Sequence, residues 1–330
     1  MPLSFAVFHL FLTLINPFEI PFQDKKELTN EDVQNIQTLL RQVQLKPRLQ
    51  ELFPIESAWF ERLRPLKDIE SRSTRCLKQL LIDSKKGQFP EVGLVKINGG
   101  GEDCFVLCCP LNGPYKSLLK SLIVGLEEIG FQGHIYYRVG GVSNPTGKEA
   151  KWAGVPYAFK IFTMMEAYNL GFSNLIWLDS SLFPFKNPQS LFDRVREEGS
   201  LMLHRSHPKG YILPATKALI ETLTTVNVEN AEHVRMWVFG LNMGQTWVHE
   251  FIEEYTQLVS IGTPFISCYP EEFVISALAK KFEKHIPSLR DSELTASRGY
   301  NKILKGQDKD PRSCWKAKEE GITFLIRDHT

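Results

Sequence analysis

The pattern of hydrophobic and polar positions changes near residue 100 of this 330-residue chain. Before that point, apolar residues recur at helical spacing over residues 33–43, and a second helix is predicted over residues 71–83. After it, short continuous apolar runs alternate with amphipathic segments of helix length. This alternation predicts an α/β domain with a mainly parallel mixed sheet and flanking helices, behind an N-terminal helical extension.

The later part of the chain divides into individual predicted elements. Strands are predicted over residues 103–109, 134–139, 174–178 and 201–204. Helices are predicted over residues 114–129, 156–168 and 246–260. The organisation that follows is an apolar N-terminal segment at 1–23, a helical extension at 24–98 and an α/β domain at 99–330.

The N-terminal apolar run, residues 5–15, admits two interpretations. Its length suits the core of a signal peptide and is too short for an ordinary membrane span. No Lys or Arg precedes Lys25, and no small-x-small cleavage site follows the run. The segment is therefore either a signal or anchor giving weak membrane association and secretory-pathway targeting, or an apolar strip packed on the protein's own surface. The sequence leaves the location open between the cytoplasm and a membrane.

Composition and charge exclude several classes of protein. The chain has 39 basic and 38 acidic residues, a formal net charge of +1, and no long basic run, so nucleic acid is not an expected partner. Its six cysteines form no CxxC pair and no zinc-site spacing. No glycine-rich turn follows the first strand predicted in the α/β part, at residues 103–109, which argues against a Rossmann oxidoreductase or methyltransferase.

Asp179 is the first candidate for chemistry, because it directly follows the apolar strand predicted at residues 174–178. Ligands of open α/β sheets bind at the carboxyl ends of the strands, where a carboxylate can meet a metal or a phosphate. An Asp followed by two serines also makes ordinary turns. The surrounding sequence favours the functional interpretation.

Three segments around Asp179 resemble the central block of nucleotide-sugar-dependent glycosyltransferases of the GT-A type. They are residues 156–160 (PYAFK), 175–181 (LIWLDSS) and 184–188 (PFKNP). The resemblance covers roughly residues 102–285, and it implies a nucleotide-sugar donor and a carbohydrate, lipid or protein acceptor. In these families an Asp-x-Asp motif holds Mg²⁺ or Mn²⁺ against the donor diphosphate. Here the motif is degenerate, because Ser181 stands where the second Asp would be.

The resemblance assigns roles to several residues. Asp179, assisted by Ser181, would hold Mn²⁺ or Mg²⁺, and the turn made by Pro110, Leu111 and Asn112 would border the nucleotide. One carboxylate and one hydroxyl bind a hard divalent cation less well than two carboxylates. Asp179 therefore either bridges the metal with help from another residue, or the domain binds donor weakly or not at all.

Four further residues complete the candidate site. Lys160 would face the diphosphate as a point charge, although a helix lysine is by default a solvated surface residue. Asn242 lies in a segment similar to one near the acceptor pocket of this superfamily. Glu271 and Glu272, at an acidic helix start similar to one in related enzymes, would include the base that deprotonates the acceptor. The helix macrodipole alone also favours acidic residues there.

Two functions follow from the sequence. The first is a glycosyltransferase that moves a sugar from a nucleotide-diphosphate donor to an acceptor, assisted by a metal at Asp179. The second is a non-catalytic GT-A-like module with a binding or structural role. The missing second Asp of the motif is the reason to consider it. The residues do not distinguish the donor sugar, the acceptor or the stereochemical outcome.

Overall fold

The computed structural model describes residues 91–109, 115–139, 155, 157–205, 211–212, 214–265, 267, 269–286, 304–306 and 323–326. The predicted N-terminal segment, most of the helical extension and the turn at residues 110–112 lie outside these ranges. Within the described ranges, no helix combines the length and apolar character that crossing a membrane requires.

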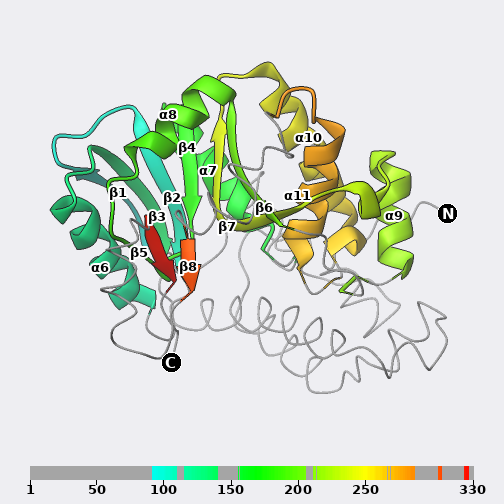
Figure 1. Cartoon of the computed structure of the whole chain (residues 1–330), viewed down its shortest axis with the longest axis horizontal. Helices are drawn as coiled ribbons and strands as arrows, with labels where there is room; N and C mark the ends of the chain where they lie inside the picture. The colour runs from blue at the N-terminus through cyan, green and yellow to red at the C-terminus, as the bar shows by residue number, and fades with distance from the viewer. Residues whose placement is uncertain are drawn as a thin grey trace, which may run out of the picture.

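A six-stranded mixed sheet forms the centre of the domain (Figure 1). Its strands, in spatial order, are β1 (Glu91–Ile97), β3 (Gly133–Val139), β2 (Asp103–Cys109), β4 (Asn174–Leu178), β7 (His233–Asn242) and β6 (Ser200–Arg205). Strand β2 pairs parallel with β3 on one side and with β4 on the other. Strands β1, β7 and β6 pair antiparallel with their neighbours. The predicted α/β class with a mixed sheet is confirmed, but the sheet is not mainly parallel, because two of its five strand pairings are parallel and three are antiparallel. Its parallel part is the three strands β3, β2 and β4.

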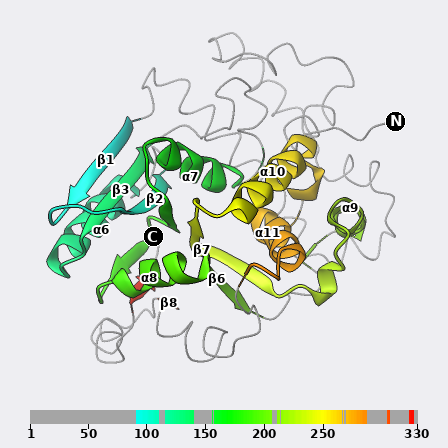
Figure 2. The same cartoon turned by 90° about the horizontal axis from the view of Figure 1, so that it is seen from above.

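Helices cover both faces of this sheet, as Figure 2 shows for α7 and α8. One face carries α6 (Tyr115–Glu128) and α8 (Gln189–Glu198). The other carries α7 (Phe159–Asn169), α10 (Thr246–Ile261) and α11 (Pro270–Lys281), with α9 (Pro214–Thr224) beside α11. Side chains of β2 alternate between the two cores, Phe105 and Leu107 toward α6 and Cys104 and Val106 toward α7. Burial on both faces explains why the strand reads as a continuous apolar run.

Smaller elements complete the described fold. They are a three-stranded sheet of β5 (Leu182–Pro184), β9 (Phe324–Ile326) and β8 (Leu304–Gly306), and two 3₁₀ turns, η2 (Val228–Asn230) and η3 (Thr263–Phe265). Strand β5 follows Asp179 and lies against α6, so it ties the turn after β4 to one face of the main sheet.

The boundary predicted between residues 98 and 99 falls too late, because Glu91–Ile97 form strand β1 at the edge of the main sheet. Its pairing with β3 makes this segment a strand, since its seven residues carry no strong hydrophobic pattern of their own. Gly93 makes room for the Tyr137 ring, and a Cβ atom there would lie 2.4 Å from Tyr137 Cζ. The side chain of Ile97 is buried in the core shared with α6.

The order in which the strands are added to the sheet reverses at β2, because β3 and β4 lie on opposite sides of it. The connection from β2 to β3 runs through α6 on one face, and the connection from β3 to β4 runs through α7 on the other. Strand β2 lies between the two strands that follow it in the chain, β3 and β4, so the strand order reverses between β2 and β4. Ligands of open α/β sheets bind in the crevice outside the carboxyl ends of the strands at such a reversal. The carboxyl edge of β3, β2 and β4 is therefore the place to look for a site.

Candidate functional site

Asp179 lies at this carboxyl edge, directly after β4. Its backbone N–H donates to the Trp237 carbonyl at 3.0 Å, and its carbonyl accepts from the Leu182 N–H at 3.0 Å, which shapes the turn into β5. The Trp177 indole Nε1 donates to Asp179 Oδ1 at 2.8 Å. The Asp179 side chain is 28% exposed. The carboxylate is therefore held in place by the preceding strand and remains partly open to solvent.

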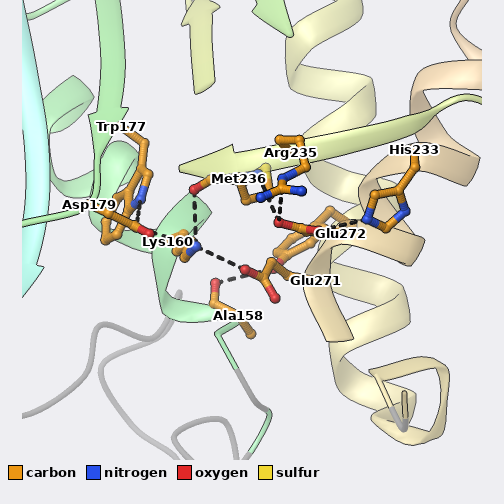
Figure 3. A network of polar contacts seen from close by, with 10 residues as sticks. Ala158, Lys160, Trp177, Asp179, His233, Arg235, Met236, Glu271 and Glu272 are labelled. Atoms are coloured by element: carbon orange, nitrogen blue, oxygen red, sulfur yellow. Dashed lines mark hydrogen bonds and ion pairs between the residues drawn. The ribbon is translucent and has the colours of Figure 1, made fainter. Parts of the chain in front are cut away.

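Lys160 lies beneath Asp179, in the first turn of α7 (Figure 3). Its Nζ atom is 2.9 Å from Glu271 Oε1, 3.0 Å from the Met236 carbonyl oxygen and 3.5 Å from Asp179 Oδ1. Burial by itself lowers the pKa of Lys160, but the charges of Asp179 and Glu271 raise it above its ordinary value overall. The interior therefore contains a charged ammonium group, where the sequence predicted either a solvated lysine or one facing a diphosphate.

Two aromatic rings flank this ammonium group. The Tyr157 and Trp177 ring centroids lie 5.5 and 5.6 Å from Lys160 Nζ, within the range of cation–π attraction. Tyr157 also has a φ of +61°, the left-handed region that large side chains rarely adopt. Such strained residues gather at functional sites. Tyr157 lies in the segment 156–160 that carries the resemblance, but its backbone angle leaves no mark in the hydrophobic pattern.

Glu271 and Glu272 occupy the first turn of α11, and both side chains are only 6% exposed. Burial raises the pKa of Glu271, although the adjacent Lys160 works in the opposite direction. Burial also acts to raise the pKa of Glu272, but the hydrogen bond and charge of His233 lower it overall. A general base has to reach the acceptor hydroxyl directly or through one water. Neither carboxylate is exposed enough to do so in this conformation.

Glu272 joins a second set of contacts on β7. Its Oε2 lies 2.6 Å from His233 Nε2, and its Oε1 accepts from the Met236 N–H at 3.3 Å. The guanidinium of Arg235 lies 3.9 Å from the Trp237 ring centroid, with its Nε 3.9 Å from Glu272 Oε1. The sequence analysis did not connect these residues with Glu272, because His233 is 39 positions away and no local pattern marks the pairing.

Asn242 lies at the opposite edge of the sheet, so its predicted place in the same site as Asp179 is wrong. It pairs with Asn174, the first residue of β4, whereas Asp179 follows the last. Five residues of strand separate the two positions by roughly 16 Å. The antiparallel direction of β7 is the cause. The Asn242 side chain instead accepts a hydrogen bond from the Gly244 N–H at 3.0 Å, within a turn.

Gly240, in the same segment, is explained by packing. A Cβ atom there would lie 2.6 Å from Val195 Cγ2 and 2.9 Å from Leu201 Cβ. The glycine therefore lets β7 approach α8 and β6 closely.

Ser181 and its neighbour Ser180 are both buried in the turn after β4. Ser180 hydrogen-bonds the Cys109 thiol at the end of β2, while burial raises the pKa of that thiol to about 11. The turn that carries Asp179 therefore contacts the strand end at the reversal point. The predicted nucleotide contacts Pro110, Leu111 and Asn112 follow Cys109 and lie outside the described residues.

The described residues around Asp179 do not form a fitting cage for a divalent cation. In the part of the chain that the structure describes, no three or more His, Cys, Asp or Glu side chains are grouped so as to hold a metal. Asp179 Oδ1 already meets an indole N–H and an ammonium group. Mg²⁺ and Mn²⁺ prefer several oxygen ligands, which these residues do not supply.

Comparison with known proteins gives a distant similarity in structure alone. No protein-family model matches the chain, and no curated protein matches its sequence. Among solved structures, the apo form of mouse xyloside xylosyltransferase 1 matches with a TM-score of 0.40 and 10% identity, over 68% of this chain and 98% of that one. The α/β class of this chain rests on its own sheet and helices.

Proposed function

We propose that this protein is a glycosyltransferase that binds a nucleotide-diphosphate sugar at the carboxyl edge of β3, β2 and β4 and transfers the sugar to an acceptor. One observation carries the proposal: a partly exposed carboxylate, Asp179, lies at this edge beside the point where the sheet reverses. The sequence resemblance in residues 156–160, 175–181 and 184–188 supports the same edge independently of the geometry.

In this proposal Asp179 accepts hydrogen bonds from hydroxyl groups of the donor. Its Oδ1 accepts a hydrogen bond from Trp177 and lies 3.5 Å from Lys160 Nζ, so the carboxylate is fixed in orientation before a ligand arrives. Preorganised acceptors of this kind bind hydroxyl groups without a cost for ordering the side chain. The predicted nucleotide contacts Pro110, Leu111 and Asn112 directly follow β2 in the sequence.

A second candidate is a module that binds the nucleotide sugar but does not turn it over. The observation that favours it is the state of Glu271 and Glu272, both of which are buried and engaged by Lys160, His233 and a backbone N–H. An inverting transferase needs an available base, and these two carboxylates do not supply one in this conformation.

The test is a calorimetric titration of UDP, GDP and their common sugar conjugates into the wild-type protein and an Asp179→Asn variant. The asparagine keeps an oxygen that can accept from Trp177. We expect donor affinity to fall by at least about tenfold in this variant. Asp193→Asn on α8, which changes an exposed carboxylate, is the matched control and should leave affinity unchanged.

Two outcomes would contradict parts of this proposal. Equal donor affinity in wild-type and Asp179→Asn protein would contradict the placement of the site. Tight binding with no release of free nucleotide across a panel of carbohydrate, lipid and peptide acceptors would replace the transferase by the binding module.

A further inference from the structure

We propose that the ammonium group of Lys160 takes the place of a divalent cation at Asp179, so that the donor binds without a metal. The donor part of this inference rests on the proposed function. The cation part rests only on the residues that surround Lys160 Nζ.

The surroundings of Lys160 Nζ are those of a bound cation. Three oxygen atoms from three different elements converge on it: Glu271 Oε1 from α11, the Met236 carbonyl from β7 and Asp179 Oδ1 from the end of β4. Carboxylate and carbonyl oxygens are the ligands that hard cations take. An ammonium group has three N–H donors, which matches the number of these oxygens. The position that a metal would need beside Asp179 is thus occupied by a side chain of the protein itself.

Lys160 is not free to make way for a metal. Its side chain is 6% exposed, and its Nζ lies 5.5 and 5.6 Å from the ring centroids of Tyr157 and Trp177. A divalent cation bound to Asp179 Oδ1 would stand within a few ångströms of the ammonium group and be repelled by it. Displacing the ammonium would leave the carboxylate of Glu271 buried without its partner, which is strongly unfavourable.

The position of Lys160 in α7 indicates that helix stability is not the reason for a lysine at this position. A positive charge in the first turn of a helix is opposed by the helix macrodipole, whereas Glu271 in the first turn of α11 is favoured by it. The carboxylates of Glu271 and Asp179 offset that cost for Lys160. Because the two carboxylates share one ammonium group, the charge of Asp179 is offset in part, and a diphosphate approaching this edge meets less repulsion than from a bare carboxylate.

The first experiment measures Mn²⁺ binding by electron paramagnetic resonance, for wild-type and Asp179→Asn protein without UDP. We expect the two proteins to bind Mn²⁺ equally, because Asp179 holds no metal. An Mn²⁺ site in the wild type that is lost in Asp179→Asn would overturn the inference. Calorimetry in Mn²⁺ and in EDTA should give UDP affinities equal to within about twofold.

The second experiment removes the internal cation together with its buried partner, in a Lys160→Met/Glu271→Gln double variant. We expect its UDP affinity in EDTA to fall by at least about tenfold, with Mn²⁺ restoring part of the loss at the now unpaired Asp179. Wild-type affinity of this variant in EDTA would overturn the inference. If the double variant does not fold, the Mn²⁺ titration of the wild type and Asp179→Asn still tests whether Asp179 holds a metal. If no nucleotide binds the wild type at all, the proposed function fails, while the Mn²⁺ titration still tests the role of Lys160.

Discussion

Replacing Lys160 by methionine is the most direct test of the charge network beneath Asp179. Methionine keeps the length and the apolar stem of the side chain but removes the ammonium group. The carboxylate of Glu271 then stays buried without its partner at 2.9 Å, and the Met236 carbonyl loses its donor at 3.0 Å. The more exposed Asp179 keeps the Trp177 N–H and can recruit water.

The expected cost follows from these distances. At an effective dielectric constant of about 20, unit charges at the two ion-pair distances attract by about 5–6 kcal/mol each, before the cost of desolvating them. Removing one member of a buried pair destabilises a protein by about 3–5 kcal/mol. We therefore expect Lys160→Met to lower the free energy of unfolding by about 3–5 kcal/mol, and Lys160→Met/Glu271→Gln to recover most of that loss.

The assay is urea unfolding at pH 7, followed by tryptophan fluorescence and circular dichroism. Lys217→Met is the matched control, because Lys217 also pairs with a carboxylate at 2.6 Å but lies on the surface of α9. Its cost should stay below about 1 kcal/mol. The reasoning would be refuted if Lys160→Met cost no more than Lys217→Met, or if the Glu271→Gln change added its full separate cost in the double variant.

Two further predictions concern α11 and β7. Because the pKa of Glu272 is lowered in the folded protein, the carboxylate stabilises the fold above its ordinary pKa, and this contribution is lost as the pH falls. Glu272→Gln should therefore cost about 1–3 kcal/mol at pH 7 and less at pH 4 in urea unfolding, and a deficit that grows on acidification would contradict the pairing with His233. Gly240→Ala should cost about 1–3 kcal/mol, because its Cβ would lie 2.6 Å from Val195 Cγ2. Gly101→Ala, whose nearest contact would be 3.6 Å, is its control in thermal unfolding, and equal losses in melting temperature would refute the packing argument.

The predictions that agree with the structure are those that depend on neighbouring residues. The apolar runs predicted as strands at 103–109 and 174–178 have the bounds of β2 and β4. The helix predicted at 246–260 is α10 to within one residue. Burial on both faces of a strand, or along one face of a helix, imposes a period that the sequence records directly.

The predictions that fail depend on which segment lies beside which. Strand β1 was assigned to the helical extension, because only its pairing with β3 makes it a strand. Asn242 was placed with Asp179, because a segment shows no sign of running antiparallel to its neighbour. The position of Asp179 at the end of a strand could be read from the sequence, but the buried lysine beneath it could not.

The sequence by itself therefore determined the alternation of strands and helices, the α/β class and the position of Asp179 after a buried strand. The tertiary structure alone decided which charges meet. Lys160 contacts the Met236 carbonyl across 76 positions of sequence, and His233 contacts Glu272 across 39. The hydrophobic period is a local property of each segment, whereas the partner of a buried charge is chosen when the segments pack, under the requirement that no charge remain unpaired in a low-dielectric interior.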